Sequence, residues 1–200
     1  MILTYATIEC TMRCMTRANS VRFYYCIVKS GFGEIIIVWR WTDKKVVRVF
    51  LPKQCDLFKS SVYNSAKVLE IHDDTVRNIC IKLSNVLQGR PTGLSLDVLD
   101  WAMTQPFQQR VLRMEYKIPH GMVSTYGRLA SKLGHSGAAR AVGTALAHNP
   151  FPIIIPCHRT IRSDKSLGGY AGGLAMKKKL LELEGVEFDR GGRVVTDRLW

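Results

Sequence analysis

The sequence predicts a mixed α/β (α+β) fold in two parts: a sheet with a covering helix in residues 1–100, and a mainly helical domain in residues 101–200. Three observations favour this class. The first half holds three β-branched and aromatic runs separated by turn residues. The second half holds short helical segments bounded by glycine and proline. Between them lies a linker-like stretch, 91–104.

The runs Arg22–Lys29, Glu34–Trp41 and Lys45–Phe50 predict an antiparallel meander, because Ser30–Gly33 and Thr42–Lys44 between them suit hairpin turns. A helix follows over residues 73–87, where apolar residues recur at three- and four-residue steps up to a Gln-Gly-Arg-Pro stop. We expect this helix to cover one face of the sheet.

The composition is that of a globular protein, with 46% apolar and 22% charged residues among 200. It excludes a disordered chain, a collagen-like repeat and a coiled coil. No apolar run is long enough to span a bilayer, and the N-terminus lacks a secretory signal. We therefore expect an intracellular protein, in the cytoplasm or nucleoid, or in the nucleus of a eukaryote.

Six cysteines in an intracellular chain indicate reduced thiols rather than a disulfide framework. Cys10, Cys14 and Cys26 with His72 match no standard zinc-ligand spacing. The glycine-rich segment 167–173 allows close backbone approach to a ligand but matches no phosphate-binding loop. We expect no metal and no cofactor.

Positive charge is concentrated in one stretch of a chain whose formal net charge is +13. Residues 101–163 hold eight lysines and arginines and a single acid, Glu115, for a net charge of +7. Such a block favours a polyanionic partner. A solvated surface that serves only solubility is the alternative.

The same stretch predicts a helix-turn-helix. A helix opened by Pro106 precedes two short helices, the first capped by Ser124 and ended by Gly134, the second capped by Ser136 and running up to residue 149. Two short helices joined by a glycine-containing turn are typical of this motif.

The second of these helices is nearly bare of long side chains, since it carries Ala138, Ala139, Ala141, Gly143, Ala145 and Ala147. A reader of the major groove needs several long polar groups, whereas a bare helix can press close to the minor groove. Arg140 is the one long side chain near its start. Packing of small residues against another helix explains the same composition equally well.

Cys157 follows an apolar run, Phe151–Ile155, and a proline, and precedes His158 and Arg159. A basic or cationic neighbour lowers the pKa of a thiol and makes it a nucleophile. On an extended segment His158 would face the opposite side, so a bridging water is expected between the two side chains. Glu184, on a final helix over 174–184, is the candidate to orient the imidazole.

The strings STYGRLA, ARAVGTAL, NPFPIIIPCHR and GGYAGGLAMKKKLLELEG together resemble the O6-alkylguanine-DNA alkyltransferase family, over about residues 105–187. The resemblance implies a ribonuclease-H-like α/β domain followed by a helical domain with a helix-turn-helix. It implies one irreversible transfer of an alkyl group from O6-alkylguanine, and from O4-alkylthymine, in double-stranded DNA to the protein's own cysteine. The first hundred residues match the family only in general layout.

The resemblance also implies roles for individual residues. Cys157 would accept the alkyl group, His158 would take the thiol proton through a water, and Glu184 would orient His158. Tyr126 would donate a hydrogen bond to guanine N3, and Asn149 would brace the turn before the cysteine. DNA would be contacted by Arg140, Ala139, Thr144, Ser124 and Thr125, with Arg140 replacing the flipped-out nucleotide. The pocket would be walled by Pro152, Tyr170, Ala171 and Thr160.

Non-catalytic relatives replace the cysteine, whereas this chain keeps Cys157, so the resemblance implies an active protein. We also expect a monomer with no membrane partner. Two alternatives remain open from the residues. A DNA-binding regulator or damage sensor would bind without transfer, and a cysteine hydrolase using Cys157, His158 and Glu184 would turn over repeatedly. The segment Phe188–Trp200 matches no feature of the family.

Overall fold

A computed structural model describes residues 13–200 apart from 17–21, 63–66, 69–72, 92 and 198. The chain divides into two compact units, Met1–Met103 and Thr104–Trp200. Each unit is described by itself.

The first unit is built on a five-stranded antiparallel sheet in the order β4-β3-β2-β1-β5. The strands are β1 (Arg13–Thr16), β2 (Arg22–Ser30), β3 (Gly33–Arg40), β4 (Val46–Phe50) and β5 (Lys67–Val68). The meander of β2, β3 and β4 confirms the sequence prediction. The short β1 and β5 were not predicted, because strands of four and two residues carry too little pattern.

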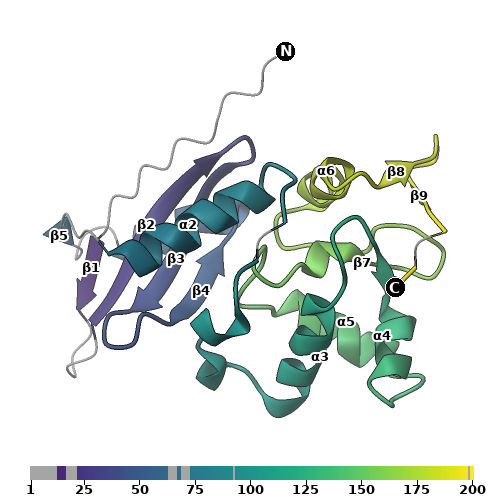
Figure 1. The fold of residues 1–200 in the computed structure, drawn as a ribbon, viewed down its shortest axis with the longest axis horizontal. Coiled ribbons are helices and arrows are strands. Elements are labelled where there is room, and N and C mark those ends of the chain that lie inside the picture. Colours follow the sequence, from purple (N-terminus) through teal and green to yellow (C-terminus); the bar gives the residue numbers. More distant parts are fainter. Residues whose placement is uncertain (1–12, 17–21, 63–66, 69–72, 92, 198) are drawn as a thin grey trace. The chain divides into compact units, whose positions relative to one another are not determined.

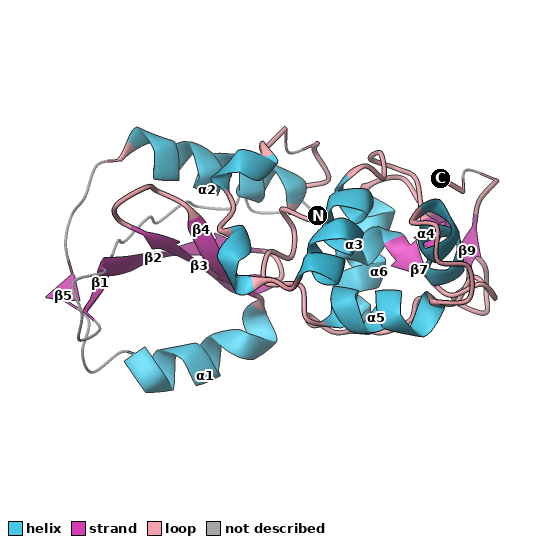
Figure 2. Ribbon diagram, turned by 90° about the horizontal axis from the view of Figure 1, so that it is seen from below, coloured by secondary structure: helices cyan, strands magenta, loops and turns pink. Residues whose placement is uncertain are grey.

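Helices cover both faces of this sheet: α1 (Pro52–Val62) on one side and α2 (Asp74–Val86) on the other (Figure 2). Alternation along the strands explains why both are needed. Tyr25 and Ile36 pack into the cluster that contains Phe58 of α1, whereas the next residue along β2, Cys26, lies with its Sγ 2.9 Å from the Sγ of Cys80 on α2. Both faces of the sheet are therefore apolar and buried.

The helix α2 was predicted, and Asp73 caps it by accepting hydrogen bonds from the backbone amides of Thr75 and Val76. The helix α1 was not predicted. Its sequence, PKQCDLFKSSV, has few apolar residues, and of the side chains that the structure describes, those of Cys55 and Phe58 are buried. A helix with so narrow an apolar stripe gives a weak periodic signal.

In the part of the second unit that the structure describes, four α-helices lie with two short strand pairs (Figure 1). Its helices are α3 (Pro106–Tyr116), α4 (Tyr126–Lys132), α5 (Ala139–Ala147) and α6 (Leu174–Leu183). The parallel pair β6 (Ser124–Thr125) and β7 (Thr160–Ile161) and the hairpin of β8 (Glu187–Phe188) and β9 (Val194–Val195) complete it. One 3₁₀ turn of this unit lies at Cys157–Arg159, and two others, Leu96–Val98 and Trp101–Met103, lie at the end of the first unit.

Two predicted helix caps are wrong. Thr125, not Ser124, caps α4, because its hydroxyl accepts the Arg128 amide. Ser136 does not cap α5, which begins after Ala138 without a side-chain cap. Both helices nonetheless lie where the sequence places them.

The segment that the sequence left without interpretation closes the end of the second unit. Val194 of β9 packs with Val123, Ile161 and Leu181 in one buried cluster. The Trp200 amide donates to the carbonyl of Val123. Val194 of this segment is therefore part of this unit's core.

Among the described residues no helix is long and apolar enough to cross a membrane, and no three histidine, cysteine or acidic side chains gather as metal ligands. Cys10 and His72, which entered the zinc comparison, lie outside the described residues.

Candidate active site

A tight turn after α5 carries Cys157. The Asn149 side chain organises it: Oδ1 accepts the Phe151 amide at 2.9 Å, and Nδ2 donates to the Ile155 carbonyl and to Cys157 Sγ, both at 3.2 Å. Within the turn Ile153 adopts φ 71°, a conformation that β-branched residues rarely enter. The backbone is therefore strained just before the cysteine, and buried packing of Ile153 holds it there.

Cys157 opens a 3₁₀ turn rather than lying on a strand, so the extended geometry considered from sequence is wrong. Its side chain borders a cavity of about 360 Å³, within the size range of small-ligand sites. The cavity is lined by Tyr126, Gly143, Leu146, Ala147, Asn149, Pro152, Cys157, Gly169, Tyr170 and Ala171. A buried sulfur at the wall of such a cavity can meet a ligand without meeting bulk water.

The resting thiol is protonated. Burial raises the pKa of Cys157 to about 11, although the amide of Asn149 and the charge of Lys177 act to lower it. The expectation that adjacent cations lower this pKa is thus wrong for the unliganded protein. Arg159 cannot fulfil it, because its guanidinium is held by Glu184 at 2.8 Å through both Nε and Nη2.

Glu184 binds the two residues that follow the cysteine, His158 and Arg159. It accepts hydrogen bonds from His158 Nε2 at 2.9 Å and from Arg159, and all three side chains are buried. Burial alone would raise the pKa of Glu184, but His158 and Arg159 outweigh burial and lower the pKa to about 2. Glu184 is therefore an anion at neutral pH.

These bonds select the tautomer of His158. Burial lowers its pKa, only partly offset by Glu184, so the imidazole is neutral at pH 7. With Nε2–H donated to an ionised carboxylate, the lone pair lies on Nδ1. Nδ1 is buried and has no hydrogen-bond partner among the described residues. It is the nitrogen free to take a proton.

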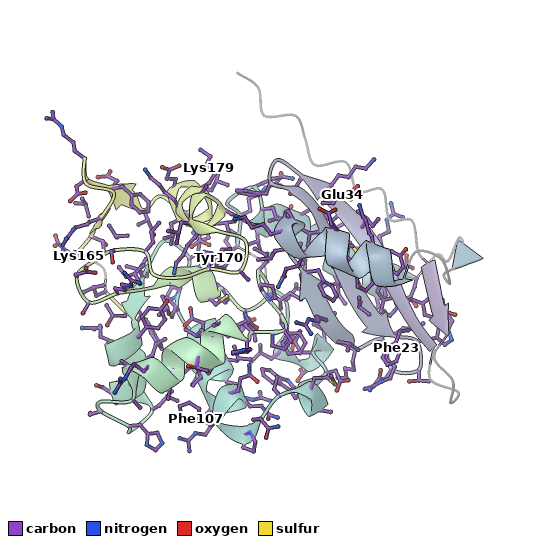
Figure 3. All side chains as sticks on the ribbon, turned by 180° about the vertical axis from the view of Figure 1, so that it is seen from behind. Phe23, Glu34, Phe107, Lys165, Tyr170 and Lys179 are labelled. Atoms are coloured by element: carbon purple, nitrogen blue, oxygen red, sulfur yellow. The ribbon has the colours of Figure 1, made fainter. Side chains whose placement is uncertain are left out.

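Tyr126, the first residue of α4, stands over the glycine-rich loop. A Cβ on Gly168, whose φ is +68°, would lie 2.8 Å from the Tyr126 hydroxyl, and a Cβ on Gly143 would lie 3.7 Å from its ring. Two glycines thus make room for this side chain. Tyr170 (Figure 3) also lines the cavity, and its buried hydroxyl has no hydrogen-bond partner among the described residues.

One face of α5 is exposed and carries small side chains apart from Arg140 and His148. Arg140, Ala141, Thr144 and Ala147 are exposed, whereas Val142, Ala145 and Leu146 are buried. Helix packing accounts for the buried face, and the exposed face remains open to a ligand. Gly143 and Ala147 of this helix also line the cavity, so the exposed face and the cavity adjoin.

Six of the fourteen site residues expected from the sequence line this cavity: Tyr126, Asn149, Pro152, Cys157, Tyr170 and Ala171. Three others lie where their side chains do not fit the expected contact. Thr160 is fully buried and does not line it; its hydroxyl donates to Glu115. Ser124 is fully buried and its hydroxyl donates to the carbonyl of Trp200, so this side chain is not available at the surface. Thr125 is buried at the start of α4, where its hydroxyl caps the helix.

Sequence reasoning missed two buried charged residues beside the cysteine, Glu115 on α3 and Lys177 on α6. Lys177 lies within the KKK run of the last helix, which reads as a solvated face. For Glu115 a signal existed: it is the only acid in a strongly basic stretch.

The site defines a class: proteins with one buried nucleophilic cysteine at a small cavity beside an exposed, small-residue helix. Comparison with known proteins identifies it further. Residues 106–186 match the model of the 6-O-methylguanine DNA methyltransferase, DNA binding domain. The chain belongs to the methylated-DNA–protein-cysteine methyltransferase family.

Two relatives of that name are 41% and 44% identical to this chain. The first, from Methanothermobacter thermautotrophicus, aligns over 57% of this chain and 64% of its own length. The second, from Saccharolobus islandicus, aligns over 53% of this chain and 67% of its own. Alignments to several mycobacterial relatives cover 47% of their lengths, so the chain spans less than two thirds of most of these relatives.

A solved structure extends the likeness to both units. The crystal structure of Mycobacterium tuberculosis OGT in complex with DNA is 31% identical, with a TM-score of 0.61, and the match covers 80% of this chain and 91% of that one. The mixed α/β architecture is therefore that of the family.

Proposed function

We propose that this protein repairs alkylated DNA by moving an alkyl group from the O6 atom of guanine, or the O4 atom of thymine, onto Cys157. The observation that carries the proposal is the placement of Cys157 Sγ on the wall of the cavity that adjoins the exposed face of α5. The family's name and the DNA-bound relative support it.

The chemistry is a single displacement. The Cys157 sulfur bonds to the alkyl carbon as the bond from that carbon to guanine O6 breaks, and the thiol proton passes through a water to His158 Nδ1. Guanine leaves with its own hydrogen-bonding pattern restored and takes up one proton in exchange. Ionised Glu184 stabilises the imidazolium that forms.

Coupling of proton removal to the reaction fits a thiol whose resting pKa is high. The neutral His158 is a base at the pH of the cell, and Asn149 offers the developing thiolate an amide donor. Tyr126 supplies a hydroxyl donor to the leaving purine at N3. The residues present need no metal ion or cofactor for this displacement.

The alkylated base is flipped out of the duplex to reach the cavity, since O6 is inaccessible within the stack. In this proposal α4, the turn 133–138 and α5 form a helix-turn-helix, and α5 enters the minor groove. Ala139 and Thr144 contact the sugar-phosphate backbone of the DNA. Arg140 fills the space that the base leaves. The first unit is a ribonuclease-H-like domain by the same family layout.

The product is a thioether, which the neighbouring side chains have no means to hydrolyse, so each molecule acts once. The protein then works as a monomer in the compartment that holds the DNA. Direct thiol–imidazole contact, which a turnover hydrolase would use, is not found between Cys157 and His158.

Intact-mass measurement tests the proposal. Mixed with duplex DNA that contains O6-methylguanine, the protein should gain one methyl group per molecule, mapped to Cys157. Cys157→Ala should gain none, while Cys55→Ala, which removes a buried thiol of the first unit, should gain one. Binding without a mass change would favour the sensor alternative, and repeated turnover would favour the hydrolase.

A further inference from the structure

Three buried polar side chains from three elements meet beside Cys157 and take no part in the displacement described above. Lys177 Nζ of α6 donates to the Thr160 carbonyl at 2.6 Å and to the Gly169 carbonyl at 3.4 Å. The Thr160 hydroxyl donates to Glu115 Oε2 of α3 at 2.6 Å. Lys177, Thr160 and Glu115 each have no exposed surface.

This cluster joins the cysteine's own segment to the cavity wall, because Thr160 follows the 3₁₀ turn of Cys157 and Gly169 lines the cavity. It is also incompletely satisfied. Glu115 Oε1 is buried and has no hydrogen-bond partner among the described residues. Burial of an ionised carboxylate lowers the free energy of unfolding unless the charge is paired and hydrogen-bonded, or the carboxyl is protonated.

Burial controls the charge of both titratable groups. It raises the pKa of Glu115 to about 8, although the Thr160 hydroxyl and the charges of Lys177 and Arg159 act to lower it. It lowers the pKa of Lys177 to about 8, although Cys157 and Glu115 act to raise it. Below pH 8 Glu115 is neutral and Lys177 is a cation. Above pH 8 Glu115 is an anion and Lys177 is neutral.

Both groups act on the thiol, in opposite directions. Lys177 lowers the pKa of Cys157 and Glu115 raises it. The other charged or titratable groups that act on these residues are Tyr126 on α4, Tyr170 of the glycine-rich loop, the exposed Arg162, and His158 and Arg159, which are both bound to Glu184. Lys177 is therefore the cation that a thiolate at Cys157 meets.

We infer that Lys177 and Glu115 are an opposed pair of positioning residues that sets the nucleophilicity of Cys157, with Lys177 stabilising its thiolate and ionised Glu115 opposing it. Thr160 links the two, since its hydroxyl stabilises the ionised form of Glu115 and its carbonyl accepts from Lys177. The pair regulates the acceptor of the proposed function, on which this inference rests.

A probe that needs no DNA tests this inference separately from the proposed function. Iodoacetamide alkylates thiolates with loss of iodide, and peptide mass after short pulses gives the rate at Cys157 alone from pH 6 to pH 10. Lys177→Met should slow this rate about threefold to tenfold below pH 8, where the ammonium is charged. Glu115→Gln should leave it unchanged at pH 6.5 and raise it about threefold or more at pH 9.

Two further variants guard against a merely structural explanation. Thr160→Val removes the donor to ionised Glu115 and should shift the profile in the direction of Glu115→Gln. Lys179→Met, on the outer side of α6 (Figure 3), removes an exposed lysine from the same helix and should match the parent. Thermal unfolding checks each fold; if Lys177→Met does not fold, the pH 6.5 to pH 9 contrast of the other two decides.

Shifts in the same direction for Lys177→Met and Glu115→Gln, or no shift in Glu115→Gln and Thr160→Val at pH 9, overturn the inference. Opposed shifts in a protein that gains no methyl from DNA would uphold it and refute the proposed function. Methyl transfer from DNA without these shifts would support the proposed function and refute the inference.

Discussion

The side-chain amide of Asn149 donates a hydrogen bond to the Cys157 sulfur at 3.2 Å, and the same side chain ties down the turn between them at Phe151 and Ile155. One residue thus both builds the strained turn and offers the sulfur a donor. A hydrogen bond to the charged form of an acid favours that form, and here it lowers the pKa of the thiol. Structure and reactivity are coupled at Asn149.

Replacement of Asn149 by alanine should lower both the stability of the protein and the reactivity of Cys157. Loss of its hydrogen bonds leaves buried backbone groups unpaired, so we expect the free energy of unfolding to fall by about 1–3 kcal/mol. Alkylation of Cys157 should slow as well. Asn149→Asp keeps an acceptor for the Phe151 amide but places a carboxylate beside the sulfur, so it should be more stable than Asn149→Ala and react more slowly. Denaturant unfolding and methyl uptake measure the two effects, and an aspartate variant as reactive as the parent would contradict this account.

Gly168→Ala should displace the Tyr126 hydroxyl. The added Cβ would lie 2.8 Å from that oxygen, and φ is +68°. We expect a loss of about 1–2 kcal/mol in unfolding free energy and slower transfer from DNA, with iodoacetamide reactivity at Cys157 retained. Gly169→Ala is the matched comparison, since a Cβ there meets nothing within 4 Å. Its unfolding free energy should stay within about 0.5 kcal/mol of the parent, and equal losses in both variants would refute the packing argument.

The elements that could be predicted from sequence are those with a strong period or a clear stop. The meander of β2 to β4, the helix α2 and the helix that Pro106 opens all have one. The helix α1 lacks a broad apolar stripe, and β1 and β5 are too short to show alternation. Their pairing is decided by long-range contacts in the sheet, which no local pattern encodes.

The site divides in the same way. Cys157, Tyr126 and Tyr170 could be located because their motifs are local strings, and the structure brings them to one cavity. The protonation state of the thiol could not be predicted, because it depends on the ion pair of Arg159 with Glu184 and on the burial of the sulfur. Burial also hides the pairing of Glu115 with Thr160, residues 45 positions apart.

Acid should destabilise the protein through Glu184. Its pKa is about 2 when folded and lies near its ordinary value of 4.5 when unfolded, so the stabilisation is complete above pH 4.5 and is lost as the pH falls towards 2. Glu184→Gln leaves buried Arg159 without an anion and should cost about 3–5 kcal/mol at pH 7. The difference in unfolding free energy between parent and variant should shrink from pH 4.5 to pH 2. A constant difference would show that ionised Glu184 contributes nothing.

Arg140→Ala should separate DNA engagement from chemistry. Arg140 is exposed on α5 and is not among the side chains that shift the pKa of Cys157, which are Asn149, Glu115 and Lys177. We expect methyl transfer from duplex DNA to fall by about tenfold or more, as loss of one good contact of about 1–3 kcal/mol implies. Transfer from the free base O6-methylguanine should not change. Lys179→Ala removes the same charge from an exposed site on α6 and controls for net charge; an equal loss with the free base would remove Arg140 from the role proposed here.

Glu115→Gln should stabilise the protein in alkaline solution. For an acid whose pKa rises from 4.5 to about 8 on folding, the folded state holds its proton more tightly, so the parent loses stability as the pH rises from 4.5 to 8. Glutamine still accepts from Thr160 but has no charge to bury. The variant and the parent should be equally stable near pH 4.5, and the variant should be more stable by roughly 1–3 kcal/mol at pH 8. Glu187→Gln makes the same change at an exposed position and should show no such trend. A Glu115→Gln difference that does not grow with pH would mean that burial does not raise the pKa of this carboxyl, and it would contradict the change between pH 6.5 and pH 9 expected for its action on Cys157.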